Sequence, residues 1–338
     1  MISIDSKYIK RCIEIAKNGL GNTAPNPMVG CVIVLNDKII GEGYTSPFGG
    51  AHAEVNAINS VINKEDLKNS TLYVTLEPCN HYGKTPPCCD LIINYKIPKV
   101  VIGCLDPNEK VNGKGIAKLK ASGCEVITEF ENELCNRHHK RFLTFFKKKR
   151  PYIILKWAQT KNGYVAPKSK IKESPVYITS KSSRQIVHKW RSEEQAILVG
   201  FNTIIQDNPK LTTRMVKGGN PIRIVVCDDR KIVKKFNVFN DEAETIIINL
   251  DSCNKNISEA KKICDDLFKN NIISVIVEGG PKTLNYFLME NLWDEARIFI
   301  GEKEFSNGIK APEIELKNSL FKLIDNDKLY IIENEYNQ

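Results

Sequence analysis

Short apolar runs rich in β-branched residues alternate with segments of helical periodicity, and this alternation limits the fold more than any other feature. In the first part of the sequence, strands are expected at 29–35, 38–43, 71–76, 99–104 and 125–128. Helices are expected at 6–19, 51–62, 88–95 and 116–121. Strands separated by helices predict an α/β sandwich around a mostly parallel sheet.

The same pattern begins again after a basic run, Lys147 to Arg150, which Pro151 follows. Further strands are expected at 152–155, 176–179, 196–199, 222–226, 245–248 and 273–277. Helices are expected at 182–191, near 258–269 and after Gly280. A single hydrophobic core rarely grows past about 250–300 residues. The 338-residue chain is therefore predicted to form two α/β domains, 1–147 and 148–338.

The composition is that of a globular protein, with 42% hydrophobic and 26% charged residues. The first residues lack the apolar segment of a signal peptide. No apolar run approaches the roughly 18–20 residues that span a bilayer. Eleven cysteines, an odd number scattered along the chain, fit a reducing compartment. We expect a cytoplasmic protein without a membrane partner.

The formal net charge of +9 leaves two interpretations open. One is a nucleic-acid partner, and the other is a lysine-rich solvated surface. No aromatic residues are interleaved with the basic run in the manner of RNA-binding segments, which favours the second. A mildly basic protein also suits small phosphorylated substrates.

One group of residues has the chemistry of a catalytic metal site: His52-Ala53-Glu54, then Cys79 and Cys88. A catalytic zinc takes three nitrogen or sulfur ligands and keeps one position for water. His52, Cys79 and Cys88 would supply the ligands for one zinc ion in the first domain. Zinc lowers the pKa of bound water toward about 7, which gives hydroxide at neutral pH. Deamination also needs a proton shuttle that is not a ligand, and Glu54 suits that role.

The expected secondary structure brings these side chains to the ends of elements. His52 and Glu54 differ by about 200° around a helix, so they converge only near a helix start. Gly49-Gly50 just upstream places them there. Cys79 follows a strand and Cys88 begins a helix, where backbone N–H groups favour a thiolate.

Two neighbouring residues leave alternatives open. Cys89 competes with Cys88 for the place of third ligand. His81 is either a metal ligand or a polar group near the substrate. A His-x-Glu pair is a weak signal by itself, as is a pair of cysteines nine apart, but both in this order favour a zinc site over coincidence.

This constellation resembles the cytidine-deaminase-like superfamily, whose signature is His-x-Glu followed by Pro-Cys-x-x-Cys. The chain departs from it, with eight residues between the cysteines. Residues 75–90, with 25–30 and 106–115, are similar to one branch, the diaminohydroxyphosphoribosylaminopyrimidine deaminases of riboflavin biosynthesis. This resemblance implies that the base and its sugar phosphate are held by Asn26, His81, Lys84 and Thr85.

The second half has no G-x-G-x-x-G after a strand, so a Rossmann fold is not supported. A buried strand at 275–277 ends in Glu278-Gly279-Gly280 before a helix. Such a turn either presents N–H groups to phosphate or simply links strand to helix. Arg191 and Arg214 are candidate phosphate clamps, although either is also compatible with a surface residue.

Taken in order, the segments from Arg150 to about Tyr286 resemble the reductase domain of the same riboflavin-biosynthesis family, which has a dihydrofolate-reductase-like α/β fold. The resemblance implies an NADPH site formed by Ala158, Tyr177, Thr203, Asp207, Gly280, Pro281, Lys282 and Thr283. It implies a substrate site formed by Ser174, Arg191, Leu211, Arg214 and Glu278. The chain departs from the family at Asn162, where an aspartate is usual, and at Tyr177, where a tryptophan is usual.

The resemblance implies a bifunctional enzyme, a hydrolase and an oxidoreductase. Zinc-hydroxide deamination of 2,5-diamino-6-(5-phosphoribosylamino)pyrimidin-4-one is followed by NADPH reduction of the ribosyl group of 5-amino-6-(5-phosphoribosylamino)uracil to ribityl. The expected partner is this phosphorylated pyrimidine rather than nucleic acid, and the expected assembly is a homodimer or homotetramer. Two alternatives remain, a tRNA or other nucleic-acid base deaminase with an appended domain, and a non-catalytic scaffold with a closed zinc site.

Overall fold

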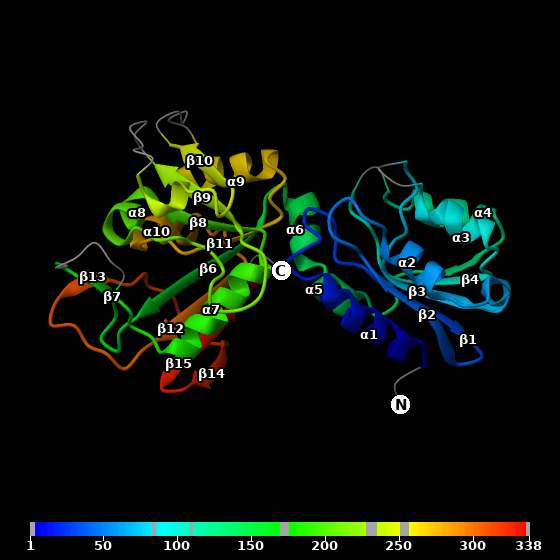
Figure 1. The fold of residues 1–338 in the computed structure, drawn as a ribbon, viewed down its shortest axis with the longest axis horizontal. Helices are drawn as coiled ribbons and strands as arrows, with labels where there is room; N and C mark the ends of the chain where they lie inside the picture. Colours follow the sequence, from blue (N-terminus) through cyan, green and yellow to red (C-terminus); the bar gives the residue numbers. More distant parts are fainter. Residues whose placement is uncertain are drawn as a thin grey trace. The chain divides into compact units, whose positions relative to one another are not determined.

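The computed structural model describes residues 4–82, 86–108, 111–169, 176–227, 235–250 and 257–335. The chain divides into two units, Met1–Lys149 and Arg150–Gln338 (Figure 1). The division lies within the basic run at 147–150. Each unit has its own sheet and its own hydrophobic core.

The first unit is built on a five-stranded sheet with the strand order β2-β1-β3-β4-β5. Its strands are β1 (Gly30–Leu35), β2 (Lys38–Tyr44), β3 (Thr71–Leu76), β4 (Lys99–Cys104) and β5 (Glu125–Ile127). β1 runs antiparallel to β2 and β3, whereas β3, β4 and β5 are parallel. Four of the five strands therefore run in one direction, and β1 runs opposite to them. The two-residue turn Asn36-Asp37, with φ of 49° and 61°, turns the chain directly back into β2.

The helices of this unit are α1 (Ile4–Ala16), α2 (Ala53–Ser60), α3 (Cys88–Asn94), α4 (Lys114–Ala121), α5 (Asn132–His138) and α6 (Lys140–Lys148). The sequence analysis missed α5 and α6, and the basic run forms the end of α6. α2 packs directly on β2 at Gly43, where a Cβ atom would lie 2.3 Å from the Ala57 nitrogen. This close approach fixes the start of α2, where His52 and Glu54 lie.

The second unit contains an eight-stranded sheet with the order β10-β9-β8-β11-β6-β12-β15-β14. Its strands are β6 (Tyr152–Gln159), β8 (Ala196–Gly200), β9 (Ile222–Cys227), β10 (Thr245–Asn249), β11 (Ser274–Val277), β12 (Glu295–Ile300), β14 (Leu320–Ile324) and β15 (Asp327–Glu333). The pairings from β10 to β12 are parallel, and β15 and β14 are added antiparallel. A separate pair joins β7 (Tyr164–Pro167) to β13 (Gly308–Lys310).

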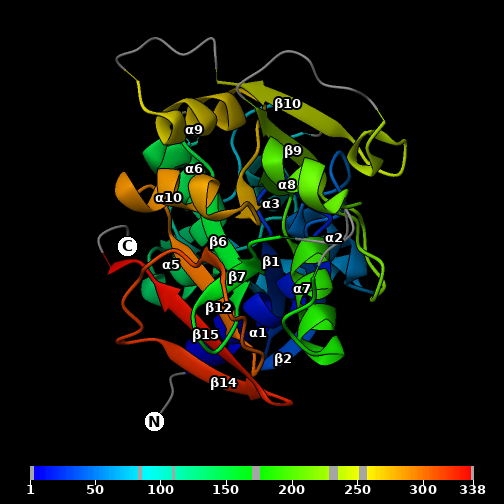
Figure 2. The same ribbon diagram turned by 90° about the vertical axis from the view of Figure 1, so that its left-hand side faces the viewer.

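Helices cover both faces of this sheet, as Figure 2 shows. α9 (Glu259–Lys269) and α10 (Pro281–Met289) pack on the face that carries Leu155 and Val277. α7 (Lys181–Glu193) and α8 (Phe201–Asp207) pack on the opposite face. Among the residues that the structure describes, no helix is both long and apolar enough to cross a membrane.

One predicted strand of the second unit was wrong. Residues 176–179 have no strand partner and lead irregularly into Ser180, the N-cap of α7. Val176 is 39% exposed and Tyr177 is 50% exposed, and only Ile178 is buried, against Gly301. The β-branched pattern therefore reflects a single buried contact instead of a sheet face. The sequence analysis also missed β7, α8 and the strands after residue 294.

Candidate active sites

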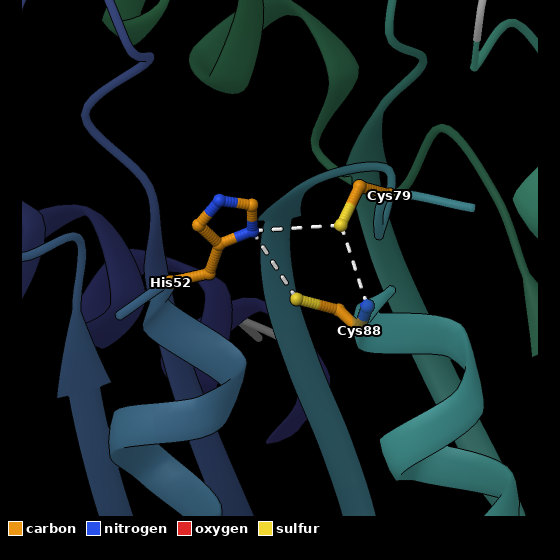
Figure 3. A group of neighbouring side chains, drawn as sticks. All are labelled: His52, Cys79 and Cys88. Carbon is orange, nitrogen blue, oxygen red and sulfur yellow. Dashed lines mark hydrogen bonds between the residues drawn. The ribbon is translucent and has the colours of Figure 1, made fainter. Parts of the chain in front are cut away.

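Three predicted metal ligands of the first unit converge at one point (Figure 3). The Nδ1 atom of His52 lies 3.5 Å from the sulfur of Cys79 and 3.3 Å from the sulfur of Cys88. The three ligand atoms all lie within 4.8 Å of one another. One nitrogen and two sulfurs at this spacing fit a tetrahedral zinc ion with a fourth position left for water.

Each of these side chains lies at or near the end of a helix or strand. His52 is the N-cap of α2, and Cys79 follows β3. Cys88 is the first residue of α3, and its backbone N–H donates to the Cys79 sulfur at 3.3 Å. The Cys88 thiol, together with this N–H and the His52 ring, lowers the pKa of Cys79 well below that of an ordinary thiol. The site therefore stabilises a thiolate, the form that binds metal.

Glu54 is the second residue of α2 and is 4% exposed. Burial, with the neighbouring Cys79 sulfur, raises the pKa of Glu54 to about 7. Its carboxyl also hydrogen-bonds with the Cys88 side chain, which brings it beside the ligand cluster. A buried carboxyl with a raised pKa next to the ligands can both accept and return a proton near neutral pH.

Cys89, the alternative third ligand, lies outside this cluster. Its thiol is buried and donates to the carbonyl of Pro78 at 3.3 Å. The one-residue step around the start of α3 turns Cys88 toward His52 and Cys89 toward Pro78. The structure brings Cys88, and not Cys89, to the other two ligands.

Glu77 is a buried acid beside the site that sequence reasoning missed. It is 3% exposed and accepts hydrogen bonds from the backbone N–H groups of Asp106, Gly113 and Ile116 at 3.4, 3.1 and 3.4 Å. These bonds hold the chain after β4 and the first turn of α4 against the segment that carries Cys79. An acid directly after an apolar strand was the signal in the sequence.

The other predicted deaminase residues occupy two segments. Asn26 precedes β1, in a stretch joined to the chain before His52 by hydrogen bonds between Val29 and Thr45 and between Phe48 and Asn22. His81 is exposed. The predicted substrate residues Lys84 and Thr85 lie outside the described residues.

A largely buried ion cluster in the second unit joins β6, the end of β11 and α7. Arg191 binds Glu278 through two hydrogen bonds, Nε to Oε1 at 3.0 Å and Nη2 to Oε2 at 2.8 Å. Lys156 Nζ lies 3.5 Å from Glu278 Oε2. Burial opposes ionisation of Glu278, but the charges of Arg191 and Lys156 outweigh it and lower its pKa to about 2. Sequence reasoning gave Lys156 no role, although a lone lysine in an apolar strand was a signal.

The predicted phosphate clamps meet at the turn after α8. The guanidinium groups of Arg191 and Arg214 both donate to the carbonyl of Thr212, each at 3.4 Å. The backbone N–H of Arg214 donates to Nδ1 of His188 at 3.0 Å. Leu211 has a φ of 56° and a buried side chain packed in an apolar cluster.

The turns after the neighbouring parallel strands β8 and β11 lie against each other. A Cβ atom on Gly200 would lie 2.5 Å from Thr283 Oγ1, and one on Gly279 would lie 2.7 Å from Thr283 Cβ. Gly280 is the N-cap of α10, and Thr203 Oγ1 lies 3.8 Å from its ideal Cβ position. A glycine-lined helix start at the carboxyl edge of a parallel sheet suits the phosphates of a dinucleotide.

Three more predicted cofactor residues lie on α8 and α10. Pro281 is the first residue of α10, and Lys282 Nζ lies 5.8 Å from the centre of the Tyr286 ring. Asp207 ends α8, one turn after Thr203 and on the same face. The structure therefore brings Thr203 to the glycine-lined turn, with Asp207 one helical turn further along α8.

The remaining predicted reductase residues are more dispersed. Ala158 lies on β6, two residues beyond Lys156, and the Tyr177 ring lies 4.1 Å from the Arg184 guanidinium carbon. Asn162 fastens a turn, because it accepts from the Thr160 hydroxyl at 2.7 Å and donates to the Phe305 carbonyl at 2.8 Å. Ser174 lies outside the described residues.

Comparison with known proteins identifies the family of the chain. The model of the RibD C-terminal domain matches residues 151–303, and that of the cytidine and deoxycytidylate deaminase zinc-binding region matches 2–104. The riboflavin biosynthesis protein RibD of Aquifex aeolicus is 39% identical over 331 residues, covering 93% of this chain and 92% of that protein. The chain belongs to the RibD family.

Solved RibD structures have the same fold. A deaminase/reductase of this family from Thermotoga maritima is 37% identical, with a TM-score of 0.85 over 98% of each chain. RibD from Acinetobacter baumannii is 30% identical, with a TM-score of 0.85 over 98% of this chain and 99% of that one. The predicted α/β fold class, a deaminase domain followed by a RibD reductase domain, is confirmed.

RibD membership also confirms the predicted bifunctional enzyme of riboflavin biosynthesis, a deaminase and a reductase. The second unit of a RibD protein is a reductase domain. The alternative of a base deaminase with an appended binding domain therefore does not describe this chain.

Proposed function

We propose that the first unit binds one zinc ion through His52, Cys79 and Cys88 and deaminates 2,5-diamino-6-(5-phosphoribosylamino)pyrimidin-4-one. The observation that carries this proposal is the convergence of the three ligand atoms within 4.8 Å, with the Glu54 carboxyl beside them. When bound, zinc supplies a water of lowered pKa. The name of the Thermotoga relative, a diaminohydroxyphosphoribosylaminopyrimidine deaminase, supports this substrate.

Glu54 moves the protons of the deamination. As a buried carboxylate it accepts a proton from the attacking water, and as a carboxylic acid it returns one to the departing amine, so that ammonia leaves. Its pKa near 7 gives it access to both forms. Asn26, His81, Lys84 and Thr85 are proposed to hold the base and the sugar phosphate.

The second unit is proposed to reduce 5-amino-6-(5-phosphoribosylamino)uracil to the ribityl product with NADPH, which supplies the hydride. The cofactor residues are proposed as Ala158, Tyr177, Thr203, Asp207 and 280–283, around the glycine-lined start of α10. The substrate residues are proposed as Ser174, Arg191, Leu211, Arg214 and Glu278. Lys156 joins this set because it shares the Glu278 carboxylate with Arg191.

Separate assays on the purified full-length protein test the two halves. Ammonia release from the diaminopyrimidine substrate is measured with and without a zinc chelator, and NADPH oxidation is measured with the deaminated product supplied directly. We expect chelator-sensitive ammonia release and chelator-insensitive NADPH oxidation. Ammonia release that survives complete removal of zinc would contradict the first proposal. A lack of NADPH oxidation by the zinc-loaded protein would contradict the second.

A further inference from the structure

Helix α7 carries three nitrogen-bearing side chains on one face: Arg184, His188 and Arg191, spaced by four and three residues. Arg191 belongs to the ion cluster with Glu278. His188 lies one turn before it and is 5% exposed. This histidine has no part in the proposed function so far.

The hydrogen bonds of His188 define which ring nitrogen carries the proton. The backbone N–H of Arg214 can only donate, so Nδ1 of His188 must accept, at 3.0 Å. A neutral imidazole that accepts at Nδ1 carries its hydrogen on Nε2. Burial, reinforced by Arg191 and Arg214, lowers the pKa of His188 to about 4, so the ring is neutral near pH 7.

The Nε2 donor lies in cationic surroundings. The charged groups that act on the ring are Arg191 from its own helix, Arg214 from the turn after α8, Lys156 from β6 and Glu278 after β11. Glu278 is already bound by Arg191 and Lys156. In the described part of the chain, no group accepts a hydrogen bond from Nε2 of His188. The hydroxyl of Thr213, beside Arg214, is buried and has no hydrogen-bond partner among the described residues.

The Nε2–H of His188 is therefore a donor that a ligand can use, and two arginines and a lysine nearby favour an anionic acceptor. We infer that His188 is a further substrate-binding residue of the reductase, whose Nε2–H donates to the substrate phosphate held by Arg191 and Arg214. The inference rests on the proposed reductase function. Through Nδ1 the same ring holds the backbone of the turn that carries Arg214. One side chain therefore positions Arg214 and also supplies its own hydrogen-bond donor to the phosphate.

Two substitutions separate the anchoring of the turn through Nδ1 from the binding of phosphate through Nε2. The amide of asparagine reaches the position of Nδ1, whereas that of glutamine reaches the position of Nε2. Reductase kinetics are measured for the full-length protein and for His188→Asn and His188→Gln, with the phosphorylated substrate and with its dephosphorylated ribosyl analogue. Loss of a hydrogen bond to a charged group predicts that His188→Asn raises KM for the phosphorylated substrate about tenfold or more. His188→Gln is expected to raise this KM less, and kcat is expected to change little in both.

With the dephosphorylated analogue, the wild type and both variants are expected to share one KM. Inorganic phosphate is expected to inhibit His188→Asn more weakly than the wild type, and ammonia release is expected to be unchanged. Wild-type KM in His188→Asn, or a higher KM in His188→Gln than in His188→Asn, would overturn the inference and leave His188 as an anchor of the turn. If the wild type itself does not distinguish the two substrates, the phosphate site of the proposed function is wrong, and the inference fails with it.

Discussion

Glu54 is a buried carboxyl in one half of the protein and Glu278 a largely buried one in the other, and their pKa values are shifted in opposite directions. Burial among cysteine sulfurs raises the pKa of Glu54 to about 7. At Glu278 burial is outweighed by Arg191 and Lys156, which lower the pKa to about 2. The same side chain is therefore a proton carrier in one half and a fixed negative charge in the other.

This contrast follows from the ligand that each site is built to receive. Around Glu54, the Cys79 thiolate and the acids nearby leave negative charge for a divalent cation to neutralise. Around Glu278, two cations face one carboxylate, and the excess positive charge and N–H donors suit a phosphorylated organic ligand. Four predictions test the contrast, ordered from the largest effect to the smallest.

Cys88→Ala is expected to abolish deamination, because a site with only two ligands does not retain zinc. Zinc content, measured by atomic absorption after dialysis, is expected to fall from about one ion per chain to near zero. Cys89→Ala is the matched control, since Cys89 is equally buried but donates to the Pro78 carbonyl. Zinc loss in Cys89→Ala with zinc retained in Cys88→Ala would reverse the assignment.

Glu54→Gln is expected to slow ammonia release by about 10²- to 10⁴-fold, the usual contribution of a positioned proton carrier. The amide has a similar shape and cannot carry the proton, so zinc content is expected to stay at the wild-type level. NADPH oxidation with the deaminated intermediate provides the control and is expected to be unchanged. Deamination at the wild-type rate in this variant would remove Glu54 from the chemistry.

Glu278→Gln is expected to destabilise the second unit by about 3 kcal/mol, because it leaves the largely buried charges of Arg191 and Lys156 beside a neutral partner. All three tryptophans of the chain, Trp157, Trp190 and Trp293, lie in this unit, so their fluorescence during urea unfolding reports on it alone.

The matched control is Asp294→Asn, which breaks another buried pair of the same unit, where Arg150 Nη2 lies 2.8 Å from Asp294 Oδ1. Both variants are expected to lose stability, but only Glu278→Gln is expected to raise the reductase KM. An equal KM in the two variants would mean that the Glu278 cluster is purely structural.

Acidification is expected to weaken the second unit in two steps. The pKa of His188 is about 4 in the folded protein, below its usual 6.5, so the unfolded chain takes up a proton first as pH falls through this window. Glu278 adds a second loss between its usual 4.5 and about 2. Tryptophan-monitored unfolding is expected to show a decrease of about 1–2 kcal/mol between pH 7 and 5 in the wild type and a smaller decrease in His188→Gln. Equal decreases would assign the effect to other groups.

Features encoded by neighbouring residues could be predicted from the sequence. His52 and Glu54 lie at the start of α2, and Cys79 and Cys88 lie where β3 ends and α3 begins, as their local sequence indicated. Each of these positions depends on a turn or cap a few residues away, so the local sequence was enough to place each metal ligand at the end of an element.

Other features depended on contacts between distant segments, and only the tertiary structure decided them. Lys156, Arg191 and Glu278 come from two strands and a helix, and their shared ion cluster arises only when β6 and β11 pair and α7 packs over them. Residues 176–179 have the composition of a strand but no neighbouring strand to pair with. The choice of Cys88 over Cys89 and the use of Glu77 as a backbone cap were decided in the same way. The sequence alone determined which side chains were available and where the elements around the metal ligands begin, whereas burial and the pairing of remote strands decided which side chains meet.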